Sequence, residues 1–108
     1  MKSFVILDFD IEGFHNYPNA PNQVSFLSNK HRHLFRIEIG ICVTELNREK
    51  EIFIEQDIVK DIIRSRFGMP AIFGQMSCEH IAKFIIDNYD CSWCKVLEDG
   101  RGGALINK

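Results

Sequence analysis

The sequence lacks the features that mark membrane, secreted and nucleic-acid-binding proteins. Its longest apolar runs, such as residues 4–7, are far too short to cross a bilayer. That four-residue run is followed by acidic residues, so the first ten residues do not resemble a signal peptide. Lys and Arg number 13 against 15 Asp and Glu, and this net charge of −2 gives no basic surplus for a nucleic acid polymer. We therefore expect a cytoplasmic protein with no membrane partner.

Repeats, low-complexity tracts and linkers are also missing, and a length of 108 residues predicts one domain over 1–108. The four cysteines are expected to be reduced in the cytoplasm. Cys91 and Cys94 have the C-x-x-C spacing of a zinc or redox pair, but the second pair that a zinc ribbon needs is absent. Ordinary packing is the better interpretation of these two residues.

Alternation of apolar and polar residues predicts two long strands. Odd-numbered positions are apolar through 5–11, and the pattern ends at His15. Odd positions are apolar again through 35–43, which predicts a strand over about 31–44. Between the two strands, residues 16–29 are rich in Asn and Pro and predict a long loop.

The second half of the chain predicts two helices and a hairpin. An apolar stripe indicates a first helix over about 55–66. Ser77 can cap a second helix over about 78–89, with Glu79 in its first turn. A glycine-rich turn joins two short strands into a hairpin over 94–107.

The resulting order of elements is β-β-α-α-β-β. Residues 67–76 contain two glycines and a proline and are interpreted as a break between the helices. Two helices between two hairpins predict an α+β fold, in which a four-stranded antiparallel sheet carries both helices on one face.

Three histidines stand at the ends of the two long strands. His15, His31 and His33 share the odd parity of the apolar residues in their own strands. His31 and His33 project to the same side, and pairing of the strands can bring His15 opposite them. Three neutral imidazoles form a suitable ligand set for Zn²⁺ with a fourth position open. The alternative is that the histidines sit at the sheet rim, bonded to loop carbonyls.

Four segments, taken in order, resemble the motifs of one protein family. The segments are IEGFHNYP, KHRHLFRIEI, MSCEHIAKFI and KVLEDGRGGALI. They are similar to the F-x-A-x-H segment, the H-G-H strand, the P-T-[AS]-E-N-L-A helix start and the V-x-V-x-E-T hairpin of the 6-pyruvoyl-tetrahydropterin synthase / 6-carboxytetrahydropterin synthase family. The match covers nearly the whole chain. It implies a diverged member with the T-fold, in which His15, His31 and His33 hold Zn²⁺.

The resemblance also implies ligand-binding residues. A glutamate at the position of Glu98 anchors the pterin in this family, because a carboxylate accepts two hydrogen bonds from the guanine-like edge of the ring. Ser77 stands where the family usually has a threonine beside the ligand, and Glu79 is the further expected ligand-binding residue. The alternatives are an exposed Glu98 before a turn and a Ser77 that only caps its helix.

T-fold proteins build rings in which the sheets of several subunits close a barrel. The resemblance therefore implies a homo-oligomer, a trimer, tetramer or hexamer, with pockets at the interfaces. Glu98 can then serve the zinc of a neighbouring subunit.

The proton-transfer groups of the family are missing from this sequence. The lyase-type members of the family use a cysteine as the base, four residues before the first histidine of the H-G-H strand. In this sequence that position is Leu27. The family's Asp-His dyad has no counterpart in the segment RFGMPAIFGQ. Glu12, Glu55 and His80 remain as possible substitutes, and no catalytic residue is assigned.

Three functional hypotheses follow. The first is a zinc-dependent carbon–oxygen lyase with impaired or altered chemistry, acting on dihydroneopterin triphosphate or a related pterin. The second is a non-catalytic binder that sequesters a purine- or pterin-type molecule or a nucleotide signal. The third is an assembly component with a vestigial site.

Overall fold

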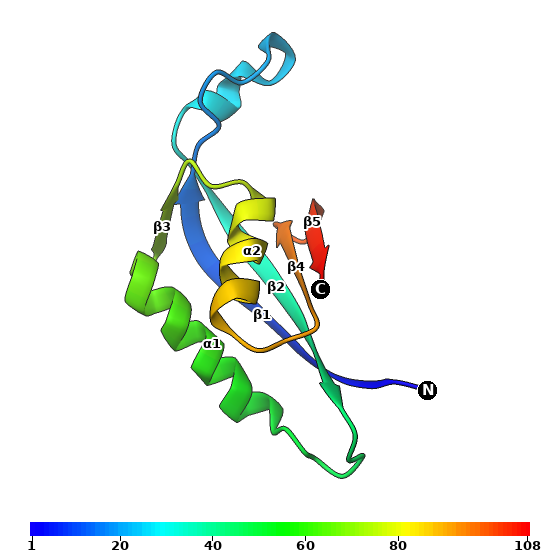
Figure 1. The fold of residues 1–108 in the computed structure, drawn as a ribbon. Helices are drawn as coiled ribbons and strands as arrows, with labels where there is room; N and C mark the ends of the chain where they lie inside the picture. Colours follow the sequence, from blue (N-terminus) through cyan, green and yellow to red (C-terminus); the bar gives the residue numbers. More distant parts are fainter.

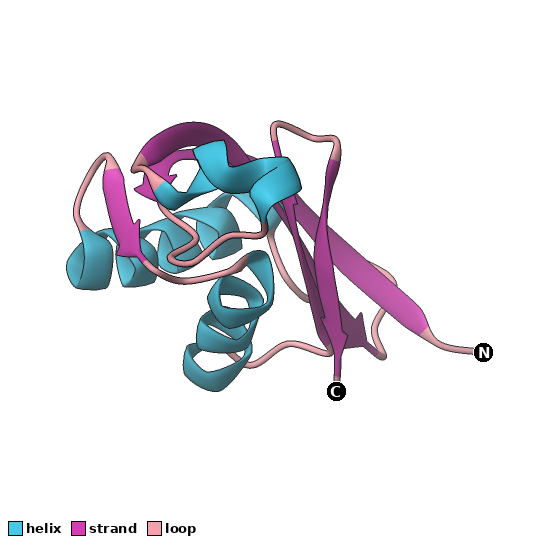
Figure 2. Ribbon diagram, turned by 90° about the horizontal axis from the view of Figure 1, so that it is seen from above, coloured by secondary structure: helices cyan, strands magenta, loops and turns pink.

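A twisted five-stranded sheet carries two α-helices on one of its faces (Figure 1). The view from above shows α1 and α2 on the same side of the sheet (Figure 2). This computed structural model describes all residues, 1–108. None of its helices is long and apolar enough to cross a membrane. The elements are β1 (Ser3–His15), the 3₁₀ helix η1 (Asn22–Ser28), β2 (His31–Val43), α1 (Ile52–Phe67), β3 (Ala71–Gly74), α2 (Cys78–Asn88), β4 (Trp93–Glu98) and β5 (Gly102–Asn107).

The strand order is β3-β1-β2-β4-β5. β1 and β2 form a long antiparallel pair that runs from Ser3 opposite Val43 to His15 opposite His31. β4 joins β2 and β5 joins β4, both antiparallel, whereas β3 lies parallel to β1. The α+β class is therefore confirmed. The prediction of a four-stranded antiparallel sheet is wrong, because the sheet has five strands and is mixed. It is also open in the single chain, with β3 and β5 at its edges.

The additional strand, β3, lies in the segment interpreted as a break between helices. Ala71 and Phe73 are buried and Ile72 between them is exposed, as expected for a strand. The strand is only four residues long; Gly68 and Pro70 precede it and Gly74 is its last residue. Four alternating residues are a weaker signal in the sequence than the turn-forming glycines and proline around them. The pairing of β3 with β1, which is distant in the sequence, decides that this segment is a strand.

Two further boundaries differ from the predictions. α1 begins at Ile52 instead of residue 55, because the Glu51 carboxylate accepts a 2.9 Å hydrogen bond from the Ile54 amide. Glutamate is not among the preferred capping residues, so the sequence marks this start only weakly. Residues 16–29 are not purely loop, since they contain η1.

The core lies between the helices and the inward face of β1 and β2. Successive strand residues point to opposite faces, so the odd-numbered apolar residues of both strands pack beneath the helices. Cys91 and Cys94 are free and buried in the same core, in agreement with ordinary packing. The largest fully buried side chains are Phe35, Leu7, Ile37, Ile39, Ile63, Ile81, Ile85, Val59, Val96 and Cys94.

Candidate metal centre

Three histidines converge where the core ends, beside the loop that joins β1 and β2. His15 and His31 are directly opposite each other in the β1–β2 ladder, and His33 lies two residues further along β2. The ring centroids are 4.6 to 5.2 Å apart. One potential ligand atom from each residue lies within 4.8 Å of the others, so the cluster can bind a metal ion. The convergence predicted from strand parity is confirmed.

Each of the three rings uses its Nδ1 atom for a hydrogen bond to an oxygen. A carbonyl or carboxylate oxygen only accepts, so each Nδ1 donates a proton, and in a neutral imidazole the lone pair is then on Nε2. Metal-binding histidines usually have this arrangement, in which an outer oxygen orients the ring and sets its tautomer. The three distances are 2.9 Å from His15 to Met76 O, 2.8 Å from His31 to Asn29 O and 2.7 Å from His33 to Asp99 Oδ2.

Two of the Nε2 atoms are buried and lack an aligned hydrogen-bond partner. They belong to His15, which is 7% exposed, and to His33. Glu98 Oε2 lies 3.0 Å from His15 Nε2, but the contact is not aligned as a hydrogen bond. Burial lowers the pKa of His15, although the Met76 carbonyl and Glu98 act in the opposite direction. The ring is therefore neutral near pH 7, and a lone pair facing a carboxylate needs a cation between them. These residues fit a divalent metal ion.

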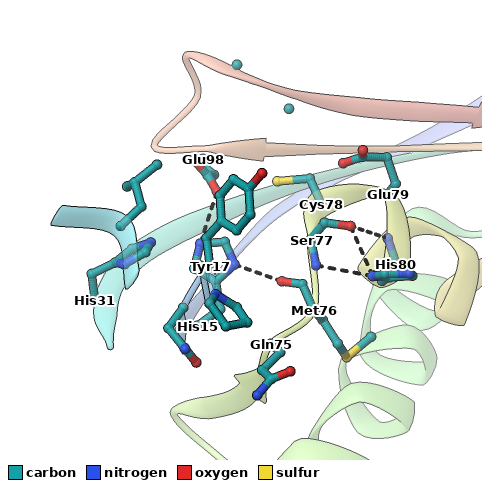
Figure 3. A pocket seen from close by; sticks show the side chains of 15 residues that line it. His15, Tyr17, His31, Gln75, Met76, Ser77, Cys78, Glu79, His80 and Glu98 are labelled. Atoms are coloured by element: carbon teal, nitrogen blue, oxygen red, sulfur yellow. Dashed lines mark hydrogen bonds and ion pairs between the residues drawn. The ribbon is translucent and has the colours of Figure 1, made fainter. Parts of the chain in front are cut away.

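A cavity of about 610 Å³ adjoins His15 and His31, whereas His33 is not among its lining residues (Figure 3). His15 and His31 line one end of it, and the start of α2 lines the other. Glu98, Ser77 and Glu79 also line this cavity, so the structure places all three predicted ligand-binding residues on its wall.

Ser77 caps α2, as predicted from the sequence. Its Oγ atom accepts a hydrogen bond from the His80 amide at 3.2 Å, and the ring Nδ1 of His80 lies 3.1 Å from the same oxygen. The two residues form a capping box, which satisfies amide groups at the start of the helix. His80 lines the cavity, but its Nδ1 is engaged by the cap and is not free to act as a base.

The other two suggested substitutes for the missing base lie outside the cavity. Glu12 is paired with Arg32 at the surface, at an even-numbered position of β1 that faces away from the histidines. Glu55 accepts a hydrogen bond from the Tyr89 hydroxyl. Their side chains therefore have structural partners away from the metal centre.

Cys78 is a cavity residue that sequence reasoning did not identify. It shares a helix face with Ile81 and Ile85, and this spacing could have placed it on the buried side. Burial and the nearby Glu98 carboxylate raise the pKa of its thiol to about 12. The thiol is therefore protonated at neutral pH and is not a base. Leu27, at the expected position of the family's base, also lines the cavity and offers no proton acceptor.

Asp99 is the second functional residue that sequence reasoning missed. It occupies the β4–β5 turn with a φ of 54°, a conformation that Asp tolerates better than most residues. One carboxylate oxygen accepts from His33 Nδ1 at 2.7 Å and the other accepts from the Leu34 amide at 2.9 Å. The hydrogen bond from His33 is the main cause that lowers the pKa of Asp99. The Asp-Gly turn signal predicts the hairpin, but not this contact with β2.

Comparison with known proteins leaves the family open. No family model matches the chain, and no curated protein matches it in sequence.

Replacing Asp99 by asparagine is expected to weaken metal binding about 10–100-fold, the range typical for loss of an outer partner of a metal-binding histidine. The amide oxygen can still accept from Leu34, whereas its NH₂ group faces the N–H of His33 and cannot accept from it. Competition with a chromophoric chelator measures the affinity. Asp57→Asn, an exposed change on α1, is the control, and equal affinities of the two variants would contradict the role of Asp99.

Proposed function

We propose that the protein holds Zn²⁺ on His15, His31 and His33 and binds a pterin- or guanine-like molecule in the adjoining cavity. The observation that carries this proposal is that all three Nδ1 atoms are committed to oxygens, so that the Nε2 lone pairs remain for a metal. Three imidazoles favour zinc over Mg²⁺ or Ca²⁺, which prefer oxygen ligands. When bound, zinc would supply a Lewis acid for oxygen atoms of the ligand.

Recognition of the ligand ring would come from Glu98 and Tyr17. The Glu98 side chain is 35% exposed on the cavity wall, and its carboxylate offers two acceptors to the 2-amino and ring N–H groups of a guanine-like edge. Tyr17 exposes its ring at the same cavity, where a planar base can stack (Figure 3). The cavity volume is within the range of small-molecule sites.

Binding without turnover is the version that the cavity residues favour. The lyase reaction implied by the resemblance needs a base, which typically contributes about 10²–10⁴ to the rate. Leu27 and the protonated Cys78 thiol do not supply one, and the Nδ1 of His80 is engaged by its helix cap. The four-motif resemblance to the 6-pyruvoyl-tetrahydropterin synthase family supports the pocket and the metal. We therefore propose a diverged member that sequesters its ligand.

A homo-oligomer belongs to the same proposal. The outer strands β3 and β5 leave unpaired backbone groups at both edges of the open sheet, and such edges favour pairing with another chain. Light scattering measures the size in solution. A mass of 12.5 kDa, that of one chain, would contradict a trimer, tetramer or hexamer.

Titration of the zinc-loaded protein with guanosine, a pterin and adenosine tests the proposed ligand class. Guanosine and the pterin are expected to bind and adenosine is not, because adenine lacks the adjacent pair of donors. Glu98→Gln is expected to lose guanosine binding, since the amide offers one acceptor in place of two. Glu38→Gln, on the outer face of β2, is the matched control.

Two outcomes would change the conclusion. Equal binding of guanosine and adenosine would overturn the proposed recognition. Formation of a pterin product from dihydroneopterin triphosphate, abolished by His31→Ala, would favour the lyase over the non-catalytic binder.

A further inference from the structure

We propose that Glu98 is the fourth ligand of the metal, so that the centre without a small molecule is a closed site of three histidines and one carboxylate. This inference rests on the proposed metal centre and changes the resting position of Glu98. The sequence analysis assigns Glu98 to the ligand ring, at its own or a neighbouring subunit's zinc, and leaves the fourth metal position open.

The distances of Glu98 from His15 and His33 place its carboxylate within reach of the metal centre. Tetrahedral zinc with Zn–N of about 2.0–2.1 Å and Zn–O of about 2.0–2.2 Å separates a nitrogen from an oxygen ligand by roughly 3.3 Å. Glu98 Oε2 lies 3.0 Å from His15 Nε2, and Oε1 lies 3.7 Å from His33 Nε2. These contacts involve the two different oxygens of the carboxylate, so that Glu98 lies beside both Nε2 atoms at separations near the value for ligands of one ion.

Hydrogen bonding does not explain these contacts. Neither Nε2 atom makes an aligned hydrogen bond, although both atoms are buried. The Nδ1 atoms of the two rings already donate hydrogen bonds, to Met76 O and to Asp99. Two lone pairs and a carboxylate facing one another repel, and a cation between them turns the same arrangement into a favourable one.

The strand register holds Glu98 in this position. Glu98 is paired with Phe35 in the β2–β4 ladder, two residues from His33 and on the same inward face. Ligands on paired strands are positioned more rigidly than ligands on loops. The carboxylate therefore reaches the histidines as a consequence of the fold.

In a closed centre, Glu98 is the metal ligand that the small molecule would displace. One carboxylate cannot both bind the ion through its oxygens and accept two hydrogen bonds from a guanine-like edge. Binding of such a molecule would move Glu98 off the metal and open a coordination position, which a structural four-ligand site does not offer. The affinity for the metal and the affinity for the small molecule are then coupled through the Glu98 side chain.

Cobalt-substituted protein tests whether the fourth position is closed. The visible spectrum of Co²⁺ in the wild type is expected to be unchanged by azide, because no exchangeable position is present. In Glu98→Gln, azide is expected to shift the spectrum, and zinc affinity is expected to fall by more than the about 10–100-fold typical of an outer partner. Glu38→Gln should behave as the wild type, and circular dichroism verifies that each variant is folded.

The outcomes separate this inference from the proposed function. Azide sensitivity of the wild-type cobalt protein, with zinc affinity unchanged in Glu98→Gln, would overturn Glu98 as a ligand while leaving the three-histidine centre in place. A wild type that binds neither Co²⁺ nor Zn²⁺ would overturn both.

Discussion

Replacing His31 by alanine is expected to remove bound zinc from the protein. Two imidazoles and the Glu98 carboxylate would remain of the four proposed ligands, and the metal content should fall from about one zinc per chain to below about 0.2 after mild purification. Zinc stabilises the folded wild type by roughly 4 kcal/mol when free zinc exceeds its dissociation constant 1,000-fold. His31→Ala should lose this stabilisation together with the metal. Elemental analysis and thermal unfolding with and without zinc measure the two effects.

His80→Ala provides the matched control for this experiment. His80 is the only histidine outside the cluster, and its ring serves the start of α2. This variant should keep its zinc and lose only helix-capping free energy. Equal zinc contents in the two variants would show that the metal is not held by the cluster, and a zinc-free wild type would contradict the proposed function.

Replacing Phe35 by alanine is expected to lower the free energy of unfolding of the zinc-free protein by about 3–5 kcal/mol. Phe35 is fully buried, and its ring packs edge-on against His15, His33 and Phe73 at centroid distances of 5.1 to 5.5 Å. The change leaves a cavity under two of the metal-binding rings. Urea unfolding measures the free energy, and zinc affinity should also fall because the rings lose their support.

Phe4→Ala is the control for lost aromatic surface, since Phe4 lies on the outer face of β1 and is 40% exposed. The loss of unfolding free energy is expected to be smaller than for Phe35→Ala, because a larger share of the Phe4 surface stays in water in the folded protein. Phe35→Leu should be tolerated far better than Phe35→Ala, because leucine fills more of the space. If Phe4→Ala and Phe35→Ala lowered the free energy of unfolding by similar amounts, this result would contradict a core that extends to the metal centre.

The edge strand β3 shows where sequence reasoning failed. Leu7 and Ile39 belong to long alternating strands, whose period of two is visible over many residues and predicts the inward face. β3 offers only four residues, and its partner β1 lies far away in the sequence. Its parallel pairing is a property of the assembled sheet, which no local pattern records. The same holds for Cys78, whose approach to Glu98 depends on how α2 packs over β4.

The sequence by itself determined which histidines share the inward face where the metal centre lies. His15, His31 and His33 follow from parity, because the alternation of a strand is local and each histidine continues the register of the core residues beside it. Only the tertiary structure decided which ring nitrogen of each histidine donates a hydrogen bond. Met76 and Asp99 approach His15 and His33 from 61 and 66 residues away, and these contacts leave both Nε2 atoms beside Glu98. A tautomer depends on the acceptor beside the ring, and here two of the three acceptors come from distant parts of the chain.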